Sequence, residues 1–139
     1  MNVNTNANTK RILIVDDESD LVEIVKLMLC REGYQVEGAE SGSECMEKLK
    51  HYHPDLILLD IMMPGLDGWK TLKLIKSDDN LSSVKVAMLT AKKLSAETLK
   101  KEEIALLADY INKPFTRESL VQRVKKILET GSGSQFFRA

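Results

Sequence analysis

The sequence predicts an α/β domain in which helices cover both faces of a five-stranded parallel sheet, a doubly wound arrangement. Five short apolar runs of strand length alternate with five segments whose apolar residues recur at helical spacing. Such alternation is typical of parallel sheets built from strand-helix-strand units. The chain has 139 residues, which is enough for one domain with a full core.

The first half of the chain supplies three strands and two helices. The strands are predicted at 12–15, 34–39 and 56–59. The last of these is the most apolar run and is predicted to be the central strand, buried on both faces. The first helix begins near Ser19 and carries an amphipathic stripe at Leu21, Ile24, Val25, Met28 and Leu29. Gly33 is a predicted C-cap, and Ser41 with Glu44 fits a capping box that opens the second helix.

The second half supplies two strands and three helices. The strands are predicted at 84–89 and 110–111. Pro and Gly interrupt both periodicities in the segment 63–68, which is therefore predicted to be a loop, and Asp67 can cap the helix that follows it. Another helix is predicted over 94–107. Thr116 starts the last one, whose apolar positions are Leu120, Val121, Val124, Ile127 and Leu128.

Composition excludes several classes of protein. Charged residues make up 29% of the chain and nearly cancel, at a net charge of −1, whereas nucleic-acid binders usually carry a basic excess. No run approaches the ~20 apolar residues that span a bilayer. The polar N-terminus lacks the apolar core of a signal peptide. Cys30 and Cys45 lie in helical apolar patterns and are interpreted as buried free thiols of a reducing compartment, so a cytoplasmic location is predicted.

Polar side chains stand where four of the predicted strands end. Asp16 and Asp17 follow the first strand, Asp60 the third, Thr90 the fourth and Lys113 the fifth. Any one of them alone has an ordinary explanation, such as a helix N-cap or a solvated lysine. Together they indicate one pocket, because parallel strands bring their carboxyl ends to one edge and ligands bind in the crevice there.

The chemistry of this set indicates a divalent cation and a phosphoryl group. Carboxylate oxygens suit Mg²⁺, and no Cys/His cluster favours zinc. Asp60 could act as a nucleophile that takes up the phosphoryl group. Such a transfer needs positioning and charge neutralisation, which Lys113 could supply as a point charge and Thr90 as a hydroxyl donor.

Four motifs identify a family resemblance. They are Ile-Leu-Ile-Val-Asp-Asp-Glu at 12–18, Asp-Leu-Ile-Leu-Leu-Asp-Ile-Met-Met-Pro-Gly-Leu-Asp-Gly at 55–68, Met-Leu-Thr-Ala at 88–91 and Asp-Tyr-Ile-Asn-Lys-Pro-Phe at 109–115. As a set they are highly specific. The chain resembles the CheY-like receiver domain of two-component response regulators. The resemblance implies a flavodoxin-like (βα)5 fold with strand order 2-1-3-4-5.

The resemblance also divides the chain. It covers a receiver domain at 10–129. By their composition, 1–9 is predicted to be a disordered lead and 130–139 a flexible tail, which is either a cloning scar or a peptide-like extension. Whether the domain acts alone or belongs to a longer regulator stays open.

The resemblance assigns the chemistry at the site to particular residues. Asp60 would accept a phosphoryl group from a phosphohistidine in a Mg²⁺-dependent reaction. The metal ligands would be Asp17, Asp60 and the main-chain carbonyl of Met62, with Asp16 acting mainly through a metal-bound water, and Mn²⁺ could substitute for Mg²⁺. Met62 is also a candidate shield of the acyl phosphate, and Lys92 a candidate modulator that steers anions, although a solvated helix approach is the more ordinary interpretation of Lys92.

A second group of residues would respond to the phosphorylation of Asp60. Thr90 and Lys113 would hold the phosphoryl oxygens, Tyr110 would turn inward, and the Lys113-Pro114 peptide would be cis. The surface formed by 94–129 would then change its affinity for a downstream partner. The upstream partner would be a histidine kinase or a histidine phosphotransferase. The domain itself would contact neither nucleic acid nor membrane, and would be a monomer or a weak phosphorylation-dependent dimer.

The resemblance implies a signalling switch that catalyses only its own phosphorylation and dephosphorylation. Two alternatives differ from it. One is a pseudo-receiver, an interaction module that is never phosphorylated. The other is a phosphatase of the haloacid-dehalogenase type, whose signature places a second Asp two residues after the nucleophile. Met62 stands at that position here.

Overall fold

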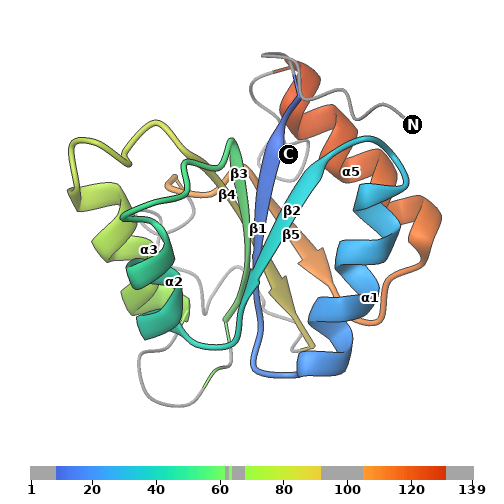
Figure 1. The fold of residues 1–139 in the computed structure, drawn as a ribbon, viewed down its shortest axis with the longest axis horizontal. Coiled ribbons are helices and arrows are strands. Elements are labelled where there is room, and N and C mark those ends of the chain that lie inside the picture. The colour runs from blue at the N-terminus through green and yellow to red at the C-terminus, as the bar shows by residue number, and fades with distance from the viewer. Residues whose placement is uncertain (1–8, 62, 64–67, 92–104, 131–139) are drawn as a thin grey trace.

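Five parallel strands form a single sheet at the centre of the molecule (Figure 1). The computed structural model describes residues 9–61, 63, 68–91 and 105–130. The strands are β1 (Arg11–Val15), β2 (Gln35–Ala39), β3 (Leu56–Asp60), β4 (Lys85–Thr90) and β5 (Asp109–Asn112). Their order across the sheet is β2-β1-β3-β4-β5, and every pairing is parallel. The predicted fold class and strand order are confirmed.

Helices cover both faces of the sheet. In the described part of the chain they are α1 (Ser19–Cys30), α2 (Gly42–Lys48), α3 (Gly68–Ser77) and α5 (Arg117–Thr130). Figure 1 shows α1 and α5 on one side of the sheet and α2 and α3 on the other. The helix predicted over 94–107 lies outside the described residues except for its last three, of which 105 and 106 form a turn. No helix in the described ranges is long and apolar enough to cross a bilayer.

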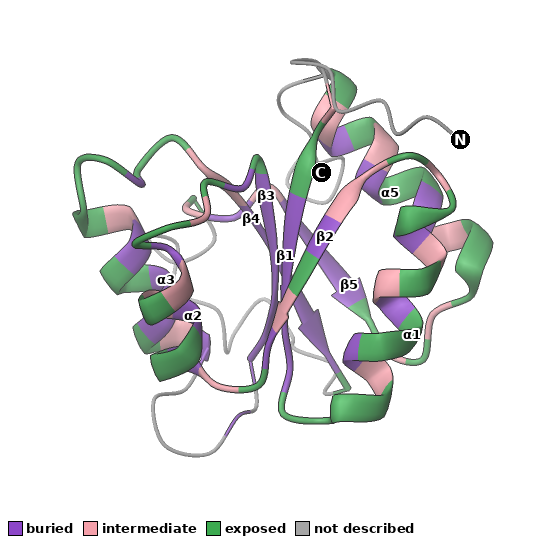
Figure 2. Cartoon of the chain, in the orientation of Figure 1, coloured by how far each residue is buried: buried purple, intermediate pink, exposed green. Residues whose placement is uncertain are grey.

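Alternate residues of each strand enter two separate hydrophobic clusters, as the two-residue period of a strand requires. Leu13, Val15, Ile57, Leu59 and Met88 belong to the cluster that includes residues of α2 and α3. Ile12, Ile14, Leu56, Leu58 and Leu89 belong to the cluster that includes residues of α1 and α5. All five residues of β3 are buried (Figure 2), which confirms the prediction of a central strand covered on both sides.

The predicted signal at the start of α5 is confirmed, whereas the C-cap residue of α1 is Arg31 and the predicted Gly33 lies two residues beyond it. Gly33 has φ 96°, a conformation that costs glycine little, and its N–H donates to the carbonyl of Cys30 at 3.0 Å. Thr116 immediately precedes α5, and its Oγ1 accepts the N–H of Ser119 at 3.0 Å. The side chain of Thr116 therefore satisfies one of the free backbone donors of the first turn.

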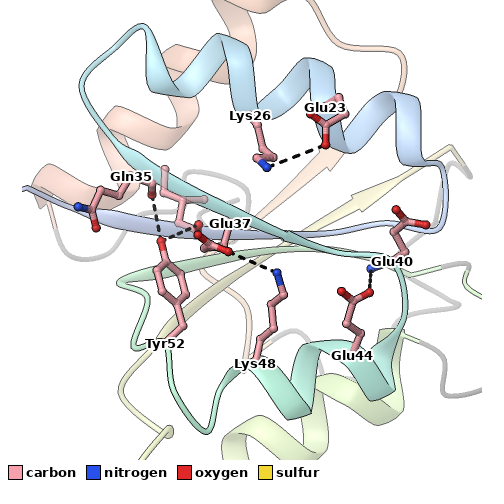
Figure 3. Close-up of polar contacts among 9 residues, drawn as sticks. Glu23, Lys26, Gln35, Glu37, Glu40, Glu44, Lys48 and Tyr52 are labelled. Carbon is pink, nitrogen blue, oxygen red and sulfur yellow. Dashed lines mark hydrogen bonds and ion pairs between the residues drawn. The ribbon is translucent and has the colours of Figure 1, made fainter.

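The capping box before α2 differs in one bond from the prediction. Ser41 Oγ accepts the N–H of Glu44 at 3.0 Å, as expected. The carboxylate of Glu44 accepts from the N–H of Glu40 at 2.8 Å, one residue before the position that a capping box uses (Figure 3).

Two predictions about α1 were wrong. Ile24 is 47% exposed, and Cys30, predicted to be buried, is exposed as well. The buried positions of α1 are Val22, Val25 and Leu29, so the side of the helix that packs on the sheet is centred on these residues. Since successive helical residues are about 100° apart, Cys30 points well away from Leu29.

The two thiols should differ sharply in reactivity. Burial raises the pKa of the Cys45 thiol to about 12, so at neutral pH it offers almost no thiolate. We expect an aromatic disulfide reagent to modify Cys30 quickly in the native protein and Cys45 only after unfolding. Cys30→Ser is the control and should leave no fast-reacting thiol. Two fast thiols in the native wild-type protein would contradict this assignment.

Candidate functional site

The carboxyl edge of the sheet holds the polar residues that end the strands. The register pairs Val15 with Leu59, Asp60 with Leu89 and Thr90 with Asn112, so neighbouring strands finish side by side. Sheet-like hydrogen bonds continue beyond the strand ends. The N–H of Asp16 donates to the carbonyl of Ala39 at 3.0 Å, and the N–H of Lys113 donates to that of Thr90 at 2.7 Å. The backbone thus fixes where each functional side chain starts.

Three aspartates gather at this edge. Asp16, Asp17 and Asp60 can each offer a carboxylate oxygen such that all three lie within 4.8 Å of one another. Asp16 is 0% and Asp60 4% exposed, whereas Asp17 is exposed to solvent. A buried carboxylate is costly unless it is paired or binds a cation. The donor set consists of oxygen atoms alone and fits a hard divalent cation such as Mg²⁺, as predicted.

Lys113 supplies a positive charge to the same cluster. Its Nζ lies 2.6 Å from Asp16 Oδ2 and 3.7 Å from Asp60 Oδ2. A third carboxylate oxygen, Glu18 Oε1, lies 3.6 Å away. The side chains of Lys113, Asp16 and Asp60 are 14%, 0% and 5% exposed, so these three charges interact with little screening.

The environment of Lys113 keeps it protonated. Burial by itself lowers the pKa of the ammonium, because the charged form loses solvation. The hydrogen bond and charge of Asp16, reinforced by the charges of Asp60 and Glu18, more than offset this and raise the pKa above that of an ordinary lysine. The site therefore holds a permanent cation beside Asp60 at every physiological pH.

Gly68 is a site residue that the sequence reasoning missed. A Cβ built at Gly68 would lie 2.4 Å from the carbonyl oxygen of Asp60 and 2.5 Å from Cα of Ile61. Both neighbours are backbone atoms and cannot rotate away. The N–H of Gly68 also faces the carbonyl of Ile61 at 3.4 Å. The start of α3 therefore packs directly against the backbone of Asp60 and Ile61. From the sequence alone, Gly68 is predicted only to be a loop residue.

The other predicted site residues are placed as follows. Thr90 is fully buried at the end of β4. Tyr110 is buried in β5, within the cluster that includes Met88. The Lys113-Pro114 peptide bond is cis, the geometry that the resemblance implied. Met62 and Lys92, predicted as a metal ligand and as modulators, lie outside the described residues.

Fold and site together define a class of protein. It is a doubly wound α/β domain whose carboxyl edge carries clustered carboxylates and a lysine, a crevice suited to a cation and an anionic group. Comparison with known families narrows this class. The model of the response regulator receiver domain matches residues 12–125, most of the chain. The chain belongs to the family of response regulator receiver domains.

Individual relatives agree with this assignment. The chain is 39% identical over 132 residues to the transcriptional regulatory protein ResD of Bacillus subtilis, which covers 95% of this chain and 53% of ResD. It is 37% identical to the phosphate regulon transcriptional regulatory protein PhoB of Klebsiella pneumoniae, covering 86% of this chain and 52% of PhoB. The chain therefore spans about half the length of these relatives.

Solved structures of receiver proteins share the fold. The chemotaxis protein CheY4 of Vibrio cholerae superposes with a TM-score of 0.78 at 29% identity, covering 86% of this chain and 98% of CheY4. The response regulator TrrA of Thermotoga maritima, solved in complex with Mg²⁺-BeF, has a TM-score of 0.75 at 34% identity. That match covers 86% of this chain and 99% of TrrA.

Proposed function

We propose that Asp60 is the phosphoryl acceptor of this receiver domain and that a phosphohistidine on a histidine kinase or a histidine phosphotransferase is the donor. One observation carries the proposal. Asp60 lies at the end of the buried central strand, within 4.8 Å of two further carboxylates and 3.7 Å from the ammonium of Lys113. This arrangement combines a nucleophile, a cation site and a fixed positive charge in one crevice.

Asp16, Asp17 and Asp60 are the residues that would hold Mg²⁺. When bound, the cation supplies neutralisation of the phosphoryl oxygens. Mn²⁺ prefers the same oxygen donors and is expected to substitute. The Mg²⁺-BeF complex of the Thermotoga relative supports this proposal. The proposed ligand role of the Met62 carbonyl and the modulating roles of Met62 and Lys92 remain inferences from the resemblance.

The protein residues divide the transfer between them. A carboxylate oxygen of Asp60 forms a bond to phosphorus while the bond from phosphorus to the histidine nitrogen breaks, and the freed imidazole stays on the donor. Lys113 is proposed to neutralise one phosphoryl oxygen from its position beside Asp60. The hydroxyl of Thr90, from the neighbouring strand β4, is proposed to donate to another.

We infer that phosphorylation changes binding at the face that the resemblance assigns to 94–129, of which the structure describes 105–129. A movement of Thr90 toward the phosphoryl group would alter the packing of Tyr110, which lies on the neighbouring strand β5. The relatives ResD and PhoB are named as transcriptional regulatory proteins, and the chain spans about half of each. We therefore propose that the receiver domain comprises 10–129 and acts through a downstream partner or a further domain rather than on nucleic acid itself.

We propose that the protein is a cytoplasmic signalling switch, either a monomer or a weak phosphorylation-dependent dimer. It is not a turnover enzyme. A pseudo-receiver would have no need of three clustered acids and a lysine at the strand ends. A haloacid-dehalogenase phosphatase would need an acid two residues after Asp60, where this chain has Met62.

Incubation with acetyl phosphate tests the proposal. We expect intact-protein mass spectrometry to show a gain of one phosphoryl group in the presence of Mg²⁺ and none with a chelator. Asp60→Asn should show no gain in either condition. An unchanged wild-type mass with acetyl phosphate and Mg²⁺, together with spectra that beryllofluoride and Mg²⁺ leave unchanged, would favour the pseudo-receiver.

A further inference from the structure

We propose that Glu18 is a positioning residue that restrains the Lys113 ammonium and repels anionic phosphoryl donors, so that it slows the uptake of phosphoryl groups from small molecules. The inference rests on the proposed function of Asp60 and adds an electrostatic selection of the phosphoryl donor at that site. A protein donor brings its own binding surface and can offset the repulsion, whereas a small dianion cannot. Glu18 would thereby favour the protein donor over small metabolites with reactive phosphoryl groups.

The geometry places Glu18 at the solvent rim of the cluster. Lys113 Nζ lies within 4 Å of carboxylates of Asp16, Asp60 and Glu18. The side chains of the two aspartates are 0% and 5% exposed, whereas that of Glu18 is 68% exposed. Any donor that approaches Asp60 past Lys113 therefore meets the charge of Glu18 close to the point of entry.

Glu18 is also an unusual residue for a helix N-cap. It is the N-cap of α1, with φ −90° and ψ 102°, and its side chain makes no capping hydrogen bond. Ser, Thr, Asp and Asn are preferred at such a position because their short side chains bond the free N–H groups of the first turn. The carboxylate of Glu18 approaches Lys113 instead. A residue that departs from the N-cap preference without a capping hydrogen bond in return is typical of a functional position.

The backbone of Glu18 also helps to position Asp16, the carboxylate that binds Lys113. Its N–H donates to Asp16 Oδ1 at 2.9 Å, while Asp16 Oδ2 accepts from Lys113 at 2.6 Å. One residue thus fixes Asp16 through its backbone and attracts Lys113 through its side chain. A substitution that keeps the backbone leaves the first contact in place and removes only the second.

The expected change in the phosphorylation rate follows from the exposed position of the Glu18 charge. Two charges at the rim of a site interact through water, and salt screens them over a Debye length of about 10 Å at 0.1 M. Removal of one rim charge should therefore raise the uptake rate from a small dianion by about threefold at low ionic strength. The gain should nearly vanish at about 1 M salt, where the Debye length is about 3 Å.

The test measures the rate of phosphorylation by acetyl phosphate at saturating Mg²⁺, at low and at high salt, in wild type and Glu18→Gln. The matched control is Glu23→Gln, which removes a charge from the same helix at nearly equal exposure, 69% for its side chain (Figure 3). Thermal melts of all three proteins exclude a change in folding.

The expected result is faster uptake in Glu18→Gln alone, with a gain that disappears at high salt. Equal rates in Glu18→Gln and wild type would overturn the inference, and so would a gain that salt does not change. A wild-type protein that takes up no phosphoryl group at all would instead reject the proposed function of Asp60, so the two failures are distinguishable.

Discussion

Gly68→Ala is expected to destabilise the domain by about 3 kcal/mol and to slow phosphorylation of Asp60 on the order of a hundredfold. The added Cβ would lie 2.4 Å from the carbonyl oxygen of Asp60 and 2.5 Å from Cα of Ile61. These backbone atoms belong to the end of β3 and the residue after it, which are paired with β4 through Asp60 and Leu89. Relief of the overlap must therefore move either α3 or the acceptor residue itself.

Chemical denaturation and the rate of phosphorylation by acetyl phosphate measure the two effects. Gly33→Ala is the matched control, because Gly33 has φ 96° but open space around its missing Cβ. It should cost about 1 kcal/mol through backbone strain and leave the phosphorylation rate unchanged. If both variants lost the same stability and kept the same rate, the close packing of Gly68 on Asp60 would have no functional role.

Lys113→Ala is expected to destabilise the metal-free domain by about 3 kcal/mol at neutral pH. The ammonium is the cation hydrogen-bonded to Asp16, whose side chain is fully buried. Its removal leaves the buried carboxylate of Asp16 without its cationic partner, next to the further negative charge of Asp60. The same variant should accept phosphoryl groups slowly, because the oxygens lose the proposed neutralising charge.

Thermal melts with a chelator and with Mg²⁺ check this prediction. A cation bound by the three aspartates should restore much of the lost stability, so Mg²⁺ should raise the melting temperature more in Lys113→Ala than in wild type. Lys50→Ala serves as the control, because its ion pair with Glu47 is exposed, and it should change stability by less than about 1 kcal/mol. Equal Mg²⁺ shifts in wild type and Lys113→Ala would indicate that the ammonium and the cation do not depend on the same carboxylates.

The sign of the pH dependence follows from the same contact. The folded protein raises the pKa of Lys113 above its ordinary value of 10.5. The stabilisation that the ammonium provides is therefore fully present below that value and is lost as the pH rises through the raised pKa. The stability difference between wild type and Lys113→Ala should accordingly stay constant from neutral pH to about pH 10 and shrink only in stronger alkali.

The strands and the residues at their ends could be predicted from sequence because their signals are local. A run such as 56–59 is apolar throughout, and Asp60 is the residue that directly follows it. The strand order came from the family resemblance, since nothing in the run itself says which strand lies beside it. The convergence of Asp60 and Lys113 followed from one rule of parallel sheets.

What could not be predicted depends on contacts between distant segments. The residues next to Gly68 in sequence predict only a loop. Its close packing is visible only in the structure, because the start of α3 lies against the end of β3. Glu18 directly precedes a helix in the sequence, and nothing there predicts its ion pair with Lys113, whose Nζ lies 3.6 Å from its carboxylate in the structure. The exposure of Ile24 likewise depends on the rotation of α1 about its axis, because an apolar stripe fixes that rotation only to about one residue.

We expect Asp60, and neither Asp16 nor Asp17, to carry the phosphoryl group. Reduction of the phosphorylated wild-type protein with borohydride converts an aspartyl phosphate to homoserine, and peptide mass spectrometry then locates it. The prediction is homoserine at Asp60 alone, only in samples phosphorylated in the presence of Mg²⁺. Homoserine at Asp16 or Asp17, or at Asp60 in samples treated with a chelator throughout, would contradict the account.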